Sequence, residues 1–168
     1  MKKTSLIFII SSILTFTLNV GCGSSGGNNN GGNGTPPPTV AVVKISTLGS
    51  PSVTPLIGAQ ATVRMPAGVS VKTFLNSTQT GSNVVIASGN AVAADLVMGV
   101  YSSASGTVNV YVTKASGFAS GEFATVNCDI ASGASPNAAD FSVTELIVSD
   151  SNGNLITGLT PSIAVTFQ

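Results

Sequence analysis

The stretch TVNVYVTKASGFASGEFATVNCDIA, residues 107–131, decides the fold of this chain. In its first part a valine stands at every second position, and polar or aromatic residues fill the positions between them. This two-residue period is typical of a strand with one buried face. In its second part the small and apolar residues again share one face, namely Ala124, Val126, Cys128 and Ile130. The stretch therefore predicts two short strands separated by Gly and Ser.

The same alternation continues on both sides, from Thr39 to the C-terminus. Short runs rich in Val, Ile and Thr are punctuated by Gly, Pro, Asn and Ser, and only 91–102 also permits a helical turn. This spacing predicts an all-β fold, an antiparallel jelly-roll-like β-sandwich of about eight to nine strands over residues 39–168. The further strands are expected at 39–47, 57–65, 69–74, 83–88, 91–102, 140–150 and 162–168. One face is expected to carry Ile57, Ala59, Ala61, Val63 and Met65, and another Phe141, Val143 and Ile147.

The N-terminus has the organisation of an export signal. Two lysines precede an apolar run from Leu6 to Leu18, which is too short for a permanent membrane span, and Gly21-Cys22 follows. This arrangement resembles the lipobox of bacterial lipoproteins, although Asn19 stands where that pattern has leucine. The resemblance implies removal of residues 1–21 and lipidation of Cys22; the alternative is a plain secretory signal. Residues 22–38 form the next segment, a flexible linker of Gly, Ser, Asn, Thr and Pro after the cysteine.

Composition excludes several classes of function. After residue 21 the chain has four basic and six acidic residues, a net charge of −2, so it offers no basic surface for nucleic acid. The sequence contains no histidine, which excludes Ser-His-Asp and Cys-His catalysis and most transition-metal sites. Glu122 and Asp129 are seven residues apart in one predicted strand, so we expect them on opposite faces and not as a catalytic pair. The sequence thus predicts no enzyme, no cofactor and no metal site.

Two short features have structural interpretations. Cys128 has no partner in the chain once Cys22 is lipidated, and its alternation with apolar residues predicts that it is buried and inert. The segment Asp150-Ser151-Asn152-Gly153-Asn154 lacks the ligand spacing and flanking helices of an EF-hand calcium loop. It is better interpreted as a hairpin turn.

A family resemblance lies in the order of motifs between residues 97 and 167. The segments YSSASGTVNVYV, GEFATVNCDI, FSVTELIVSDSNGNLI and SIAVTF follow one another as the corresponding segments do in cohesin domains. Cohesins are nine-stranded jelly-roll modules of cellulosome scaffolds, and related carbohydrate-binding sandwiches share their architecture. The resemblance implies a non-catalytic module whose partner, a dockerin, docks on the flat outer face of one sheet.

The candidate binding face is the polar and aromatic side of the predicted strand at 107–114, formed by Thr107, Asn109, Tyr111 and Thr113. We expect a lipoprotein anchored through Cys22 at the bacterial cell envelope, at the outer membrane or cell surface. Its sandwich would bind a protein partner, for which a dockerin-like module is one candidate. Two alternatives stay open. One is a carbohydrate-binding module that uses Tyr111 for a polysaccharide, and the other is a structural envelope component without a soluble ligand.

Overall fold

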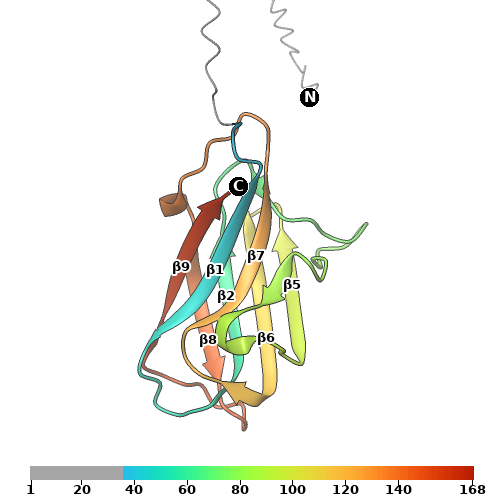
Figure 1. The fold of residues 1–168 in the computed structure, drawn as a ribbon. Coiled ribbons are helices and arrows are strands. Elements are labelled where there is room, and N and C mark those ends of the chain that lie inside the picture. The colour runs from blue at the N-terminus through green and yellow to red at the C-terminus, as the bar shows by residue number, and fades with distance from the viewer. Residues whose placement is uncertain (1–35) are drawn as a thin grey trace, which may run out of the picture. The chain divides into compact units, whose positions relative to one another are not determined.

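The fold is an all-β sandwich, described here by a computed structural model over residues 36–168 (Figure 1). The predicted signal peptide, Cys22 and most of the predicted linker lie outside the described residues. The sequence prediction of an antiparallel sandwich of about eight to nine strands is confirmed. The strands are β1 (Val40–Gly49), β2 (Leu56–Arg64), β3 (Val69–Ser70), β4 (Val85–Ala87), β5 (Leu96–Ser102), β6 (Thr107–Phe118), β7 (Glu122–Ile130), β8 (Ser142–Ser149) and β9 (Leu159–Phe167). Two short 3-10 turns, η1 (Gly89–Ala91) and η2 (Ala138–Asp140), lie between them.

The strands form two sheets that face each other across the core. In the five-stranded sheet the order is β3-β7-β1-β9, and β4 also pairs with β7; in the four-stranded sheet it is β5-β6-β2-β8. Every pairing is antiparallel. The chain crosses between the sheets repeatedly, as β1 to β2 and β6 to β7 do, which gives the fold its jelly-roll-like character. The strands that pair are therefore mostly distant in sequence.

The core lies between the two sheets. The strands of residues 107–131, β6 and β7, line it from opposite sides. Val108, Val110 and Val112 of β6 are completely or almost completely buried, as the alternation predicted. Cys128 of β7 is also buried and free, and its Sγ lies 3.7 Å from the sulfur of Met65. The prediction of a buried Cys128 is confirmed, because the thiol fills apolar space between the sheets.

A β-bulge near the start of β7 overturns the prediction for Glu122 and Asp129. The register shifts between Ile45 and Ser46, so Phe123 and Ala124 both point into the core. The extra residue places Glu122 on the same outer face as Asp129. The two carboxylates still form no pair, because β1 residues six positions apart stand opposite them, about 20 Å along the strand.

A second irregularity corrects the prediction for β8. Its pairing with β2 shifts where Thr144 is inserted, so Val143 faces the core but Ile147 faces solvent. Ile147 stands opposite Gln60, and Val148 takes the buried place beside it. The prediction that Ile147 shares a face with Phe141 and Val143 is therefore wrong. One extra residue reverses the faces of everything that follows it along a strand.

The start of β2 departs from simple alternation for a related reason. Leu56 is fully buried, whereas Ile57 is only half-buried, because the register shifts between Leu56 and Gly58. From Ala59 onward the predicted faces are correct, and the residues of the inner face are buried.

The predicted strand at 69–74 is too long. β3 ends at Ser70, and residues 73–80 form a hairpin that projects to the right in Figure 1. Thr73 pairs with Thr80 within this hairpin. The hairpin is fastened to the edge of β5, because the Thr80 amide donates to Gly99 and the Tyr101 amide donates to Thr78. The prediction failed here because the chain leaves one sheet and joins the other.

Candidate functional site

The structure brings all four predicted face residues to one surface. Thr107, Asn109, Tyr111 and Thr113 follow one another along the outer side of β6, opposite the buried valines. Because β6 lies between β5 and β2, this row runs through the interior of the four-stranded sheet and not along its rim. We call the outer side of this sheet the outer face.

The middle of the outer face is a cross-strand row with apolar character. Tyr111 stands opposite Met98 of β5 on one side and Gln60 of β2 on the other. Gln60 in turn stands opposite Ile147 of β8. Side chains placed opposite one another in this way lie about 5 Å apart and form a continuous surface. Tyr111 is thus the ring at the centre of a row that crosses the whole sheet.

The neighbouring row is polar and hydrogen-bonded. The Thr62 hydroxyl lies 2.8 Å from Oδ1 of Asn109 and 3.2 Å from Oε2 of Glu145. A threonine hydroxyl has one proton to donate, and the charged carboxylate is the stronger acceptor. The hydroxyl thus donates to Glu145 and links β2 to β8 on their solvent side, and Asn109 of β6 is the third member of the polar row.

A hollow of about 180 Å³ lies beside Tyr111, and its walls include Thr113 and Ile147. It exists because Gly58 has no side chain: a Cβ there would lie 2.7 Å from the Ser149 hydroxyl oxygen. The outer face therefore combines a shallow concavity, an aromatic ring and a fixed polar row. This arrangement can bind by apolar contact and by hydrogen bonds, and it contains no acid–base pair.

Sequence reasoning identified one strand of the outer face and missed its neighbours. Gln60 and Thr62 could be assigned to an outer side from the alternation of β2 alone. Which strands flank β6 could not be read from the pattern, so Met98 was missed. Ile147 was placed on the wrong side, because no residue type marks the bulge at Thr144.

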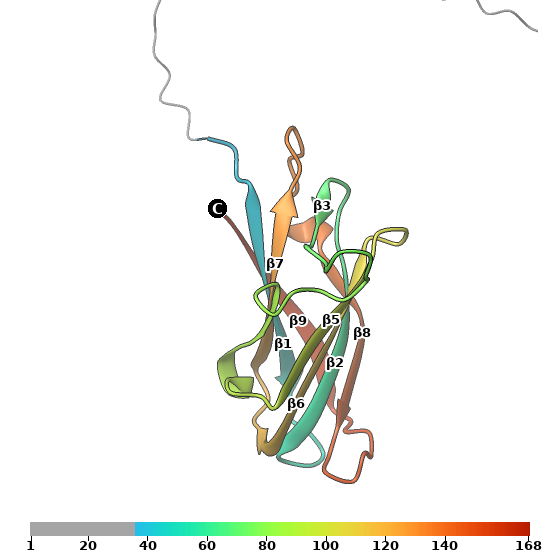
Figure 2. The same ribbon diagram turned by 90° about the vertical axis from the view of Figure 1, so that its right-hand side faces the viewer.

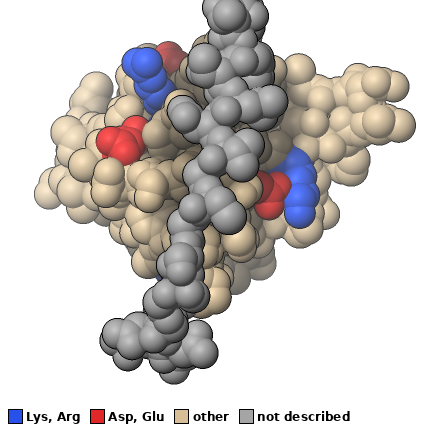
Figure 3. Space-filling view, turned by 90° about the horizontal axis from the view of Figure 1, so that it is seen from above, with Lys and Arg blue, Asp and Glu red and all other residues tan. Residues whose placement is uncertain are grey.

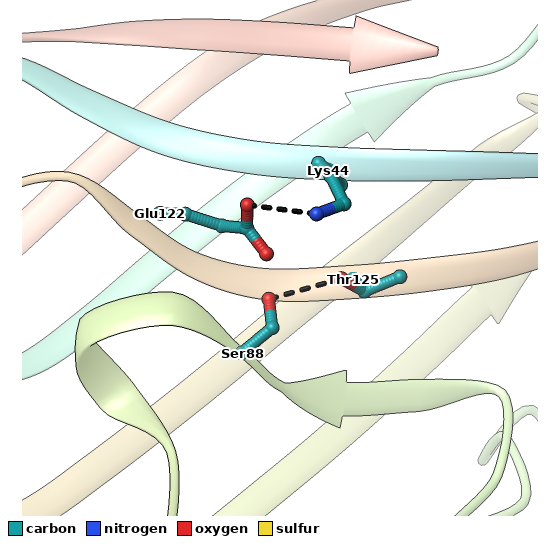
Figure 4. Close-up of polar contacts among 4 residues, drawn as sticks. All are labelled: Lys44, Ser88, Glu122 and Thr125. Carbon is teal, nitrogen blue, oxygen red and sulfur yellow. Dashed lines mark hydrogen bonds and ion pairs between the residues drawn. The ribbon is translucent and has the colours of Figure 1, made fainter. Parts of the chain in front are cut away.

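The outer face of the other sheet is built differently, from paired polar groups (Figure 4). Lys44 Nζ lies 3.1 Å from Oε2 of Glu122, and the Thr125 hydroxyl donates to the Ser88 hydroxyl at 2.9 Å. A hydrogen bond from the Ser88 side chain lowers the pKa of Glu122, and the ammonium of Lys44 lowers it further against the opposing effect of burial. These groups satisfy one another, which favours a structural role for them.

The turn after β8 holds its acidic residue through hydrogen bonds from its own amides and from Asn154. Oδ1 of Asp150 accepts hydrogen bonds from the amides of Asn152 and Asn154, and Oδ2 accepts one from the Asn154 side chain. The bonds from Asn154 are the main reason that the pKa of Asp150 is lowered. The hairpin-turn interpretation is confirmed. Within residues 36–168 no three Cys, Asp or Glu side chains gather as metal ligands, and no helix is long and apolar enough to span a bilayer.

Two further hollows lie at the end of β5, the smaller one against the hairpin and the larger one against residues 64–70. Tyr101 lines both of them, one of about 300 Å³ and one of about 540 Å³. Ser103 and Ala104 belong to both walls, and Arg64 lines the larger hollow. Most of the remaining lining residues carry hydroxyl groups or are small.

Comparisons with known proteins add no family. No family model matches this chain, and neither the curated proteins nor the solved structures contain a match to it. The case for a function therefore rests on the surfaces described above.

Proposed function

We propose that this protein is a non-catalytic bacterial lipoprotein, anchored through Cys22, that presents the outer face to a protein partner at the cell envelope. The observation that carries the proposal is the cross-strand row of Met98, Tyr111, Gln60 and Ile147, with its adjoining hollow. An aromatic ring at the centre of a broad surface is the kind of residue that dominates binding energy in protein interfaces.

The chemistry of the described residues supports a binding role. The outer face has one carboxylate, Glu145, whose hydrogen bond to Thr62 is structural. Arg64 lies on the same face, opposite Thr107 of β6 and Ser142 of β8. The resemblance to cohesins supports a protein as the partner, and a dockerin-like module is the first candidate.

Site-specific photocrosslinking in living cells tests this function. A benzophenone amino acid replaces Tyr111 in one strain and Thr125, on the outer face of the other sheet, in a control strain. We expect a discrete crosslinked protein from position 111 that is absent from position 125. Identical products from both positions, or none from position 111, would contradict a partner on the outer face.

The anchor is tested separately. Mass spectrometry of the purified protein is expected to find Cys22 as the first residue with its acyl groups. An unmodified Cys22, or a chain that still begins at Met1, would refute the anchor and leave the outer-face proposal standing.

A polysaccharide is the second candidate ligand, and the two hollows beside Tyr101 favour it. The wall of the smaller hollow is rich in hydroxyl groups, which offer the hydrogen bonds that sugars require, and Tyr101 lies between the two hollows. Ala104→Tyr adds bulk to the wall that both hollows share and should abolish glycan-array binding. Glycan binding that Tyr111→Ala abolishes and Ala104→Tyr leaves intact would move the sugar site to the outer face.

A further inference from the structure

One lateral edge of the sandwich is both uncharged and apolar. It is formed by the hairpin at 73–80, β4, η1 and the residues that follow η1, and Figure 2 looks onto this side of the molecule. No Lys, Arg, Asp or Glu occurs from residue 73 to residue 94, and the exposed Asp95 marks its end. Of the eight exposed large hydrophobic side chains in the described part, four belong to this edge: Phe74, Leu75, Ile86 and Val92. We call residues 73–94 the apolar edge.

The hairpin is the most exposed part of the apolar edge. Leu75 is 92% exposed and Phe74 is 57% exposed. Seen from above, the lobe that projects to the right contains no blue or red side chain (Figure 3). Two adjacent, strongly exposed hydrophobic side chains on a protruding turn without charges are a candidate site for contact with an apolar partner.

The tip is held in a defined conformation. The Phe74 amide donates to the carbonyl of Gln79, and the Ser77 amide donates to the carbonyl of Phe74. The Ser77 hydroxyl accepts a bond from the Gln79 amide, and Asn76 adopts a left-handed conformation at φ +57°. Asparagine tolerates that conformation well. Phe74 and Leu75 are therefore displayed by a closed turn that is fastened to β5.

We propose that the apolar edge lies against a phospholipid bilayer, with Phe74 and Leu75 reaching into its interface. The proposal rests on the proposed anchor at Cys22, and it deepens the proposed function by giving the anchored domain an orientation. Between Cys22 and Pro36, the first described residue, the chain can span at most about 50 Å. Anchoring at Cys22 would thus keep the start of the domain within about 50 Å of the membrane, and the hairpin can touch the bilayer whenever the linker is not fully extended.

The shape of the edge favours lipid over protein as its occupant. Phe74 and Leu75 together offer about 300 Å² of apolar surface, well below the roughly 1,200 Å² that a stable protein interface buries. They stand on a projection and not in a groove, so they suit insertion into a deformable phase. At one border Lys72 lies 3.6 Å from Asp129, and at the other Lys114 donates to the carbonyl of Val92 close to the exposed Asp95. Both borders therefore carry charges of both signs, as a zone at the level of the lipid headgroups can accommodate, and the uncharged part is confined to residues 73–94.

This orientation agrees with the use of the outer face. The apolar edge borders β5, so a bilayer beneath it leaves the rest of the four-stranded sheet open to the side. A flexible linker alone would let the domain rotate freely. Contact through the hairpin instead holds Tyr111 and its row toward the space beside the membrane.

Tryptophan fluorescence tests the contact, because the natural chain contains no tryptophan. Leu75→Trp introduces a single fluorophore at the hairpin tip, and Leu155→Trp introduces one at a turn residue that is 71% exposed and lies outside the apolar edge. The full lipidated protein is reconstituted into vesicles of phosphatidylethanolamine, phosphatidylglycerol and brominated phosphatidylcholine. We expect a blue-shifted emission and a roughly twofold quenching for Leu75→Trp, and neither for Leu155→Trp.

Two results would overturn the proposal. Equal emission and quenching at positions 75 and 155 would show that the hairpin does not enter lipid. A blue shift at position 75 that needs no lipid and grows with protein concentration would show that a second copy of the chain covers the edge. The mass of the N-terminus, measured on the same sample, separates these outcomes from failure of the anchor. A partner crosslinked at Tyr111 is likewise independent of them.

Thiol labelling of whole cells provides a second measurement. A membrane-impermeant maleimide is expected to label Leu155→Cys and to leave Leu75→Cys unlabelled until detergent dissolves the bilayer. Cys128 does not interfere, because it is buried between the sheets. Rapid labelling of Leu75→Cys in intact membranes would contradict the contact.

Discussion

Tyr111 of β6 and Ile147 of β8 lie on the same side of one sheet, on either side of Gln60, although they are 36 positions apart in the chain. The bulge at Thr144 turns Ile147 outward, and the absence of a side chain at Gly58 leaves a hollow between the two residues. Tyr111, Gln60 and Ile147 thus form one continuous surface across three neighbouring strands. Four predictions test this surface, the packing of the core and the two groups whose pKa is shifted.

Truncating Tyr111 should weaken binding to the protein that the crosslinking experiment identifies. We expect Tyr111→Ala to raise the dissociation constant at least about tenfold, which corresponds to about 1.4 kcal/mol. The ring is more than half buried and stands between Met98 and Gln60, so the free energy of unfolding should also fall, by about 1–2 kcal/mol, and urea denaturation confirms that the variant is folded. Titration calorimetry checks the affinity, and Thr125→Ala on the opposite sheet is the control. An equal loss in both variants would mean that the outer face is not the interface.

Substitution by alanine should lower the free energy of unfolding more at Gly99 than at Gly58. A Cβ at Gly99 would collide with the Thr80 hydroxyl oxygen and come within 2.5 Å of a Val85 methyl group, inside the packed core. Gly99→Ala should therefore lower the free energy of unfolding by about 1–3 kcal/mol. Urea denaturation of the purified protein measures the change.

Gly58→Ala is the matched control for that substitution. Its new Cβ would meet only the Ser149 hydroxyl, which can rotate toward solvent, so we expect a loss below about 1 kcal/mol. If Gly58→Ala were as destabilising as Gly99→Ala, the assignment of Gly99 to the inner face and Gly58 to the outer face would be wrong.

The Cys128 thiol should be unreactive in the folded protein. Burial raises its pKa from 9.0 to about 12, and the charge of Asp129 adds to this effect. An aromatic disulfide reagent at pH 8 is expected to leave the native protein unmodified and to react fully in denaturant. Because the unfolded thiol ionises near pH 9 and the folded one does not, this group also removes stability as the pH rises from about 9 toward 12. Fast reaction of native Cys128 would contradict its burial.

The Lys44–Glu122 ion pair should add to the free energy of unfolding at neutral pH and should lose this contribution in acid. The Ser88 hydrogen bond and then Lys44 hold the pKa of Glu122 below its ordinary value of 4.5. This contribution is present above pH 4.5 and is lost as the pH falls through the lower folded-state value. Glu122→Gln should remove that part of the acid dependence and cost about 0.5 kcal/mol at neutral pH. Thermal unfolding as a function of pH, with Glu145→Gln as the comparison, measures both effects.

The sequence predicted the class of fold because alternation is a local property. Two-residue periodicity in β6 and β7 identified the buried valines and Cys128 without reference to any other strand. The candidate face on β6 followed from the same period. Where alternation failed, an extra residue was present, at Phe123 of β7 and at Thr144 of β8. The identity of a bulged residue depends on the strand opposite, which no local pattern contains.

The hairpin at 73–80 is another part of the fold that the sequence alone could not predict. Its first residues, Thr73 and Phe74, continue the β pattern of the preceding segment, and only the hydrogen bonds from the hairpin to β5 reveal that it belongs to the other sheet. The exposure of Phe74 was therefore not predictable, because a hydrophobic residue in a strand pattern is normally assigned to the core, and Leu75 lies beyond the predicted strand.

By itself the sequence determined the strand-forming segments, the faces within β6, and the absence of histidine chemistry. The tertiary structure alone decided which strands flank Tyr111, on which side Ile147 and Glu122 lie, and that four exposed hydrophobic side chains belong to the uncharged segment 73–94. The physical reason is that side-chain alternation is set by the backbone of one strand. Pairing, bulges and surface patches instead arise from contacts between residues far apart in the chain.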